Sequence, residues 1–518
     1  MVAPQKIGTY RDDSWASVLS EIEARRNEVS RTLHPKTRTA MGQFFTPIPV
    51  ACFMADTIAV AGDRISILDP GAGIGVLSAA LVSRLASAQR PPARIDITLF
   101  ELEAAFGAPL RQTMEACQTA CESSGIHLEY QILNEDFICS TAAALASPMM
   151  TGVRVDFDCA VLNPPYKKLS SDSELRRVLS RCGIEVNNLY SAFLALTARL
   201  IKPAGEMVAI TPRSFCSGPY FKAFRRDFLS RVAIDRIHVY ESRSDAFSDD
   251  EVLQENIIFH AVKTQQRPAA VSITTSAGPG GDVLTERVTP AREVLHPGDH
   301  DLVINIVDSQ NSHDVTQAVK RLPSHLLDLG LTVSTGRVVD FRALPLLHSK
   351  PADGTVPLIY PHNLEGGRVV WPKEHAKKAS AIDLGASAYD LLVPNEIYVL
   401  VKRFSAKEER RRIVAAVYTP EQFNFTSVGF ENHLNYFHVA GRGLVRELAY
   451  GLAAYLNSTI ADTYFRTFNG HTQVNAGDLR RLQYPTKDQL ISLGKQLGSA
   501  IANSEKLDGA IERLLLQV

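Results

Sequence analysis

Short apolar runs alternate with helical patterns along the first half of the chain. Residues 65–68, 95–100 and 156–162 have the length and the apolar composition of buried strands. Between the first two of them, residues 76–88 repeat apolar positions at helical spacing. Strands that alternate with helices predict an α/β fold built on a parallel sheet.

The pattern changes near the middle of the chain. Pro, Gly, Ser and Thr accumulate between residues 265 and 297, which predicts a linker over residues 266–300. We expect four further parts on either side of this linker: an N-terminal helical segment (1–40), an α/β domain (41–265), a mixed α+β domain (301–485) and a C-terminal helix (486–518).

Composition restricts the class of protein more than its function. The 518 residues are 45% apolar and 21% charged, and no apolar run approaches the length of a membrane span. The start lacks the hydrophobic segment of a signal peptide, and the cysteines number seven, an odd count that does not suit a disulfide framework. We therefore expect a cytoplasmic protein without a membrane partner. The net charge of −1 means that any surface for nucleic acid must be a local patch.

The tetrapeptide Asn163-Pro164-Pro165-Tyr166 directly follows the apolar run that ends at residue 162. Such a position, just past the carboxyl end of a strand, is where open α/β sheets bind their ligands. Two prolines fix the backbone, so the Asn163 amide oxygen and the Pro164 carbonyl become two stiffly held acceptors. Two fixed acceptors suit one planar NH2 group. Taken alone, the same turn could simply end a strand.

A glycine-rich turn, Asp69-Pro70-Gly71-Ala72-Gly73-Ile74-Gly75, separates the first strand from its helix. Its glycines allow a ligand to approach the backbone closely. The Asp69 carboxylate disfavours a pyrophosphate and favours a cation, such as the ammonium and sulfonium of S-adenosylmethionine. Glu101 ends the second strand, where βαβ units place an acid on ribose hydroxyls.

Three further places carry weaker signals. Asp136 and Phe137 follow a third strand, where they could hold the adenine of a cofactor or serve as a helix cap and a core contact. Phe45 and Thr46 precede Pro47 in a loop that leads into a helix. Phe247 is a single large apolar residue in an acidic loop between two late strands.

The motifs GQFFTP, DPGAGIG, Glu101, EDF and NPPY, in this order, resemble the γ-class N6-adenine DNA methyltransferases of type II restriction-modification systems, of the PstI and BsuBI type. The resemblance implies a Rossmann-like methyltransferase domain followed by a target-recognition domain. It also implies S-adenosyl-L-methionine as cofactor, duplex DNA as partner, a bacterial cytoplasm with attachment to the nucleoid through DNA, and a possible separate restriction endonuclease. In-line methyl transfer with a sulfonium leaving group needs no metal.

Roles follow from the resemblance residue by residue. Cofactor contacts are implied for Phe45, Thr46, Asp69, Gly71, Gly73, Glu101, Asp136 and Phe137. Catalysis is implied for Asn163, Pro164, Pro165 and Tyr166. Stacking on an extruded target adenine is implied for Tyr166 and Phe247.

The later part of the chain carries basic clusters and the amide-rich loop 468–475. Such residues either form solvated faces or contact DNA phosphates and base edges. The candidates for DNA contact are Arg337, Lys402, Arg403, Arg410, Arg411, Arg412, His471, Gln473 and Asn475.

Other functions share some of these features. Asn-Pro-Pro-Tyr also occurs in enzymes that methylate RNA bases or protein glutamine, so it identifies the kind of nitrogen better than the polymer. The long second domain favours DNA, because reading a duplex sequence requires such a module. A DNA-binding specificity subunit is a further alternative, but such a subunit has no use for a cofactor turn together with this tetrapeptide.

Overall fold

The structure is a computed structural model that describes residues 13–32, 45–146, 155–240, 256–278, 283–373, 378–405, 409–422, 425–470, 472–498 and 504–515. The chain divides into two compact units, Met1–Ser309 and Gln310–Val518. Within the described ranges, no helix combines the length and the apolar character that crossing a membrane requires.

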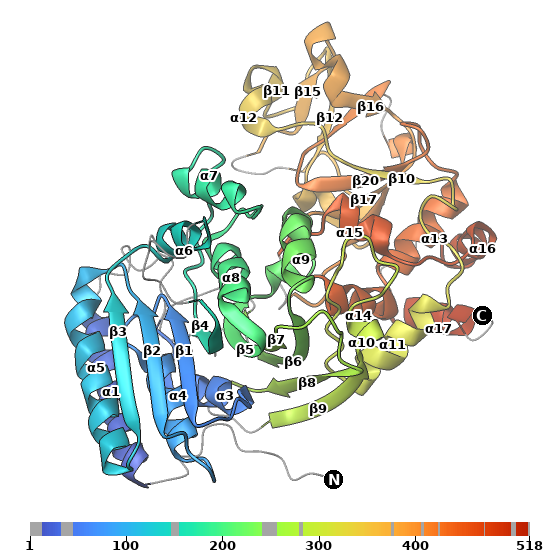
Figure 1. Ribbon diagram of the computed structural model, residues 1–518. Helices are drawn as coiled ribbons and strands as arrows, with labels where there is room; N and C mark the ends of the chain where they lie inside the picture. Colours follow the sequence, from blue (N-terminus) through green and yellow to red (C-terminus); the bar gives the residue numbers. More distant parts are fainter. Residues whose placement is uncertain are drawn as a thin grey trace. The chain divides into compact units, whose positions relative to one another are not determined.

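The first unit is built on a nine-stranded sheet (Figure 1). Its strands are β1 (Arg64–Pro70), β2 (Arg94–Phe100), β3 (His127–Leu133), β4 (Phe157–Leu162), β5 (Ile201–Pro212), β6 (Ala233–Tyr240), β7 (Asn256–Val262), β8 (Ala270–Ser276) and β9 (Val283–Pro290). Their order is β3-β2-β1-β4-β5-β7-β6-β8-β9, with β1 to β5 parallel and β7 antiparallel to both neighbours. The order reverses between β1 and β4, which is the place where such sheets bind ligands.

Helices cover both faces of this sheet. They are α1 (Asp13–Thr32), α3 (Ile48–Thr57), α4 (Val76–Ala86), α5 (Ala104–Ser123), α6 (Phe137–Ala146), α7 (Glu174–Arg181), α8 (Leu189–Leu200), α9 (Lys222–Leu229) and the short α10 (Ala291–Val294). One apolar core joins the sheet to α1, α3, α4 and α5, and a second core joins the opposite face to α6, α8 and α9. The predicted α/β fold with a parallel sheet is confirmed.

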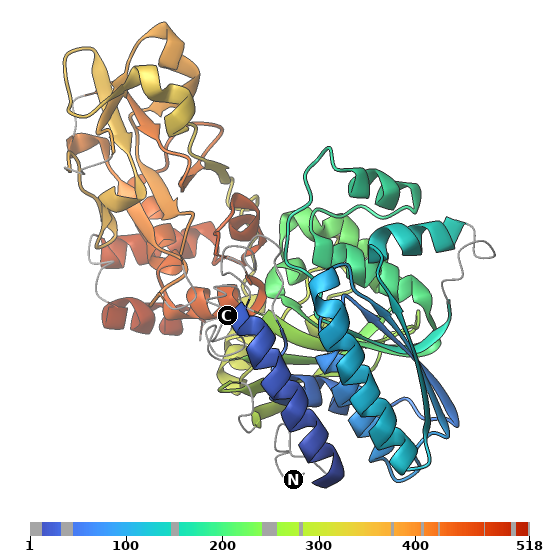
Figure 2. The same cartoon turned by 90° about the vertical axis from the view of Figure 1, so that its left-hand side faces the viewer.

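One expected boundary of the first unit is wrong. Residues 266–300, expected as a linker, form β8, β9 and α10, and the two strands extend the sheet. Val271 and Ile273 alternate with outward Ser and Thr residues, and β-branched threonines suit a strand as well as a loop. The expected N-terminal helical segment (1–40) contains α1, which lies along α5 (Figure 2) and donates a 3.1 Å hydrogen bond to it from Arg25 Nη1 to Thr113 Oγ1.

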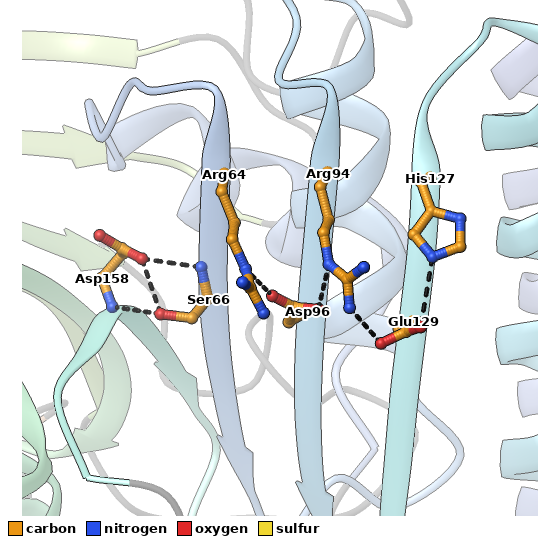
Figure 3. A network of polar contacts seen from close by, with 7 residues as sticks. All are labelled: Arg64, Ser66, Arg94, Asp96, His127, Glu129 and Asp158. Atoms are coloured by element: carbon orange, nitrogen blue, oxygen red, sulfur yellow. Dashed lines mark hydrogen bonds and ion pairs between the residues drawn. The ribbon is translucent and has the colours of Figure 1, made fainter.

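Polar side chains connect the strands at their amino-terminal ends (Figure 3). The Asp96 carboxylate accepts from Arg64 Nε at 2.6 Å and from Arg94 Nε at 2.9 Å, which links β1 to β2. The Asp158 carboxylate of β4 accepts from the Ser66 hydroxyl of β1 at 2.6 Å. Because a one-residue slip would break all of these pairs, the network fixes the strand register and leaves the opposite, carboxyl end of the sheet for chemistry.

The second unit combines two small sheets with helices. One sheet has the order β10 (Thr332–Thr335), β20 (Leu434–His438), β17 (Tyr398–Lys402), β18 (Ala415–Tyr418), β14 (Arg368–Val369) and β13 (Leu364–Glu365). The other has the order β11 (Leu347–His348), β15 (Ala381–Asp383), β12 (Thr355–Ile359), β19 (Ser427–Phe430) and β16 (Leu392–Pro394). This arrangement is the mixed α+β class that the sequence predicts.

The helices of the second unit are α11 (Gln310–Lys320), α12 (Asp340–Ala343), α13 (Arg446–Leu456), α14 (Thr459–Phe468), α15 (Ala476–Arg481), α16 (Lys487–Leu497) and α17 (Ser504–Leu515). The single helix expected over 486–518 is therefore wrong, since α16 ends at Leu497 and is followed by Gly498, whose φ of +48° does not continue a helix. The helices α13 and α16 cross closely at Gly451 and Gly494. A Cβ on Gly451 would lie 1.8 Å from the Leu490 carbonyl oxygen.

Candidate active site

The turn after β1 is shaped by three glycines with positive φ. Gly71, Gly73 and Gly75 have φ of +75°, +59° and +86°, and Gly75 is the N-cap of α4. A Cβ on Gly73 would lie 3.2 Å from the ring of Phe45, and one on Gly75 would lie 2.8 Å from a methyl of Leu110. The close approach of these neighbours and the left-handed backbone both require glycine here.

Glu101 holds this turn from the end of β2. Its side chain is buried, and its two oxygens accept from the Gly73 N–H at 2.7 Å and from the Glu103 N–H at 2.8 Å. Burial raises the pKa of Glu101 to about 7, although these backbone hydrogen bonds work in the opposite direction. Each carboxylate oxygen keeps a second lone pair, so Glu101 can also accept hydrogen bonds from ligand hydroxyls.

Asp69 lies at the end of β1 beneath the turn and is fully buried. Its Oδ2 accepts from the Ser78 hydroxyl of α4 at 2.6 Å, whereas its Oδ1 has no hydrogen-bond partner among the described residues. Burial raises the pKa of Asp69 to about 7. An unpaired buried carboxylate oxygen fits a site that receives a cationic group.

Asp136 and Phe137 form the helix cap and the core contact that were one of their two predicted interpretations. Asp136 Oδ1 accepts from the Cys139 N–H at 2.9 Å and so caps α6. Phe137 is buried, with its ring centroid 5.1 Å from that of Phe100 and 4.9 Å from that of Phe193. Both residues nevertheless line the cavity beside the glycine turn.

This cavity holds about 310 Å³, within the range of small-molecule sites. The predicted residues that line it are Phe45, Thr46, Gly71, Gly73, Glu101, Asp136, Phe137, Asn163 and Pro165. The sequence analysis missed Leu102, Lys167, Leu175 and Phe193, which also line it. These four carry no motif, and only the fold brings them to the site.

Asn163 follows β4 and is held at both ends of its carboxamide. Its Nδ2 donates to Thr46 Oγ1 at 3.0 Å, and its Oδ1 accepts from the Tyr166 hydroxyl at 3.2 Å. Thr46 is buried two residues before α3, and its contact with Asn163 joins the loop at residue 46 to the tetrapeptide. The sequence implied a role for Thr46 beside the cofactor, and the contact with Asn163 was not foreseen.

Tyr166 lies beside the cavity rather than among its lining residues. Its hydroxyl also donates to the Ile210 carbonyl of β5 at 3.4 Å, and its ring packs edge to face on Tyr190 with centroids 6.3 Å apart. Pro164 is buried in the turn. Phe247, the expected partner of Tyr166 in stacking, lies outside the described residues.

In the second unit, burial corrects one predicted DNA contact. Arg412 is 1% exposed, and its guanidinium donates to Ser405 Oγ at 3.0 Å and to Asn469 Oδ1 at 2.8 Å. Asn469 in turn donates to the Gln473 carbonyl at 3.0 Å. Arg412 therefore organises the loop 468–475 from inside the protein, and its expected contact with a DNA phosphate is wrong.

The other candidates differ in exposure. Arg337 and Arg410 are exposed, whereas Arg411 lies 3.7 Å from Asp508 of α17 and Arg403 donates to the Asn432 carbonyl at 2.7 Å. Lys402 and Gln473 are half-buried, as is Asn475, which is the N-cap of α15 and whose backbone N–H donates to Asp478 at 2.8 Å. His471 lies outside the described residues.

Two curated relatives match almost the whole chain. Type II methyltransferase M.BsuBI of Bacillus subtilis is 42% identical over 507 residues, which is 96% of this chain and 98% of the relative. Type II methyltransferase M.PstI of Providencia stuartii is 39% identical over 496 residues, which is 95% of this chain and 96% of the relative. The chain belongs to this family of type II methyltransferases.

Two further comparisons concern a part of the chain and the fold. The family model of the Eco57I restriction-modification methylase matches residues 112–247. The structure of the type IIL restriction-modification enzyme MmeI in complex with DNA superposes with a TM-score of 0.55 at 12% identity, over 99% of this chain and 76% of that one. At this identity the likeness extends to the fold alone.

Proposed function

We propose that this type II methyltransferase transfers the methyl group of S-adenosyl-L-methionine to N6 of an adenine in duplex DNA. The observation that carries the proposal is a single cavity lined by the glycine turn, by Glu101 and by Asn163. A site suited to S-adenosylmethionine thus adjoins Asn163, whose carboxamide suits an exocyclic amine.

The described residues fit the cofactor in charge and shape. Glu101 and Phe137 line the cavity, where Glu101 would accept from the ribose hydroxyls and the ring of Phe137 would pack on the adenine. Asp69 lies beneath the turn and is not part of the lining, and its unpaired Oδ1 would balance the ammonium from there. The glycine turn leaves room for close approach to the backbone. When bound, the cofactor supplies a methyl group made electrophilic by the sulfonium.

The target amine is a poor nucleophile because its lone pair is delocalised into the adenine ring. The Asn163 Oδ1 and the Pro164 carbonyl would accept hydrogen bonds from its two N–H groups. They would favour a pyramidal nitrogen whose lone pair is less delocalised. Thr46 and Tyr166 hold the Asn163 carboxamide by its two ends, so the acceptor is positioned before the substrate arrives. The amine proton then leaves to water.

An adenine N6 inside a duplex cannot reach this site, so the nucleotide must leave the base stack. We propose that Tyr166 and Phe247 stack on the extruded base, and that the second unit recognises the target sequence. Arg337 and Arg410 are exposed candidates for phosphate contact in that unit. A separate restriction endonuclease with the same specificity is the partner we expect for a methyltransferase of this type.

Transfer of a tritiated methyl group tests the proposal. Wild-type protein and an Asn163→Ala variant would be incubated with labelled cofactor and with duplex DNA, RNA or a glutamine-containing protein fraction. We expect label only in DNA, and none with Asn163→Ala although that variant still binds the cofactor. Label in RNA or protein but not in DNA would overturn the proposal.

A further inference from the structure

Asn256, the first residue of β7, carries a buried side chain without hydrogen bonds. The residue is 4% exposed, and neither its Nδ2 nor its Oδ1 has a hydrogen-bond partner among the described residues. A buried carboxamide in this state costs free energy, because water has been removed and nothing replaces it. Such groups are rare in folded proteins and require an explanation, such as a ligand that completes them.

Strand pairing places Asn256 close to the tetrapeptide. Its antiparallel partner is Pro212, at the carboxyl end of β5. Two residues earlier in β5, the Ile210 carbonyl accepts from the Tyr166 hydroxyl. Because adjacent strands lie about 4.8 Å apart, Asn256 is one strand away from the point where Tyr166 is attached to the sheet.

Asn256 and Asn163 also face the same side of the sheet. Asn256 lies two residues before the ladder partner of His238, so the side chains of Asn256 and His238 share a face. The ring of His238 lies 4.4 Å from that of Phe53 in α3, which identifies the face that α3 covers. Thr46 lies two residues before α3 and accepts from Asn163, so the tetrapeptide turns toward that face as well.

We propose that Asn256 is a specificity-determining residue that recognises the extruded adenine, with its Nδ2 donating to a ring nitrogen of the base. This inference rests on the proposed function. Asn163 and Pro164 contact the exocyclic amine, which cytosine also possesses. These two contacts therefore do not recognise the rest of the base edge. An Nδ2 donor suits N7 of adenine, because N7 is an acceptor without a counterpart in cytosine, whereas adenine N1 beside N6 resembles cytosine N3 beside N4.

The inference predicts opposite effects on stability and on catalysis. Asn256→Leu keeps a similar volume and removes the unpaired polar atoms, so the melting temperature of the protein without DNA should rise. A matched control is Asn363→Leu, because Asn363 is equally buried but accepts from the Tyr360 N–H at 2.9 Å and donates to the Val370 carbonyl at 2.8 Å. That variant should melt at a lower temperature.

The decisive experiment combines the variant with altered substrates. Methylation by full-length wild-type and Asn256→Leu proteins would be measured as kcat/KM on duplexes that carry adenine, 1-deazaadenine, 3-deazaadenine or 7-deazaadenine at the target position. We expect Asn256→Leu to lose tenfold to a hundredfold on adenine. One of the deaza bases should lower kcat/KM of the wild-type protein by a similar factor. The same base should not lower kcat/KM of Asn256→Leu any further.

Each other outcome has a defined meaning. Three results would overturn the role of Asn256 and leave the proposed function intact. The first is that each of the three deaza bases lowers kcat/KM by the same factor in Asn256→Leu as in wild type. The others are a wild-type kcat/KM of Asn256→Leu on adenine and a lower melting temperature of that variant. Failure of the wild-type protein to methylate adenine at all would overturn both.

Discussion

Thr46 has a specific expected role at the scale of single residues. Its hydroxyl accepts from Asn163 Nδ2, and without that contact the carboxamide could rotate and present its NH2 end to the target amine. Thr46→Val should therefore lower kcat about tenfold, which corresponds to ~1.4 kcal/mol in the barrier, while Thr46→Ser should keep most of the activity. Single-turnover rates on a target duplex measure this effect. A Thr46→Val variant with wild-type kcat and weakened cofactor binding would assign Thr46 to the cofactor instead.

The acids below the glycine turn predict a pH dependence of cofactor binding. Burial raises the pKa of both Asp69 and Glu101 to about 7, so both carboxyls become protonated as the pH falls below 7. Affinity for S-adenosylmethionine should fall over the same range, because its ammonium loses a negative partner. Titration calorimetry at several pH values between 6 and 8 measures this change in affinity, which should extend over about one pH unit on either side of 7.

Asp69 also makes the free protein sensitive to pH in the opposite sense. A carboxyl whose folded pKa of about 7 exceeds its unfolded value binds a proton more readily when folded, so its contribution to stability is present at low pH and is lost as the pH rises through 7. Asp69→Asn should flatten this slope and raise the melting temperature at pH 8. It should also weaken cofactor binding by about 1.5–3 kcal/mol, since a charged hydrogen bond is lost. Unchanged affinity would remove Asp69 from the cofactor site.

Nine of the 23 residues that line the cavity could be predicted from local motifs, because chemistry at a strand end needs particular residue types at fixed positions. Pairings that depend on distant segments could not be predicted. Thr46 and Asn163 are 117 residues apart, and nothing near either one indicates their contact. Arg412 looked like a surface charge because its buried partner Asn469 is distant in sequence.

At the scale of elements, the crossing of α13 and α16 predicts a stability effect. Gly451 packs against the backbone of α16, so Gly451→Ala forces the helices apart and should lower the free energy of unfolding by about 1–3 kcal/mol or more. Gly477 in α15 is the matched control, because a Cβ there meets no atom within 4 Å. Gly477→Ala should be neutral or should stabilise by up to about 1 kcal/mol. Equal melting temperatures for the two variants would contradict the observed crossing.

Element types were predictable where periodicity was strong, as in β1, α4 and β4. The strands β8 and β9 were not, because small polar residues occur in loops and in exposed strands alike, and pairing with β6 decides between them. The close crossing of α13 and α16 could not be predicted from their glycines either, since a crossing depends on two helices together.

At the scale of the whole molecule, the division at residues 309 and 310 suggests separable tasks. A chain that ends at residue 309 should bind S-adenosylmethionine with nearly unchanged affinity and should lose sequence-specific binding to DNA. Within the full chain, Arg410→Ala should weaken binding to all sequences and reduce its salt dependence, whereas Gln473→Ala should change base preference. Equal losses from both substitutions on every duplex would contradict this distinction.

The central claim is the identity of the methylated atom, and mass spectrometry of nucleosides from methylated DNA tests it most directly. Duplex DNA treated with the wild-type protein and S-adenosylmethionine would be digested and its modified nucleosides identified. The account predicts N6-methyldeoxyadenosine, absent from DNA treated with Asn163→Ala. Methylated cytosine in place of methylated adenine, or N6-methyldeoxyadenosine at wild-type level with Asn163→Ala, would contradict it.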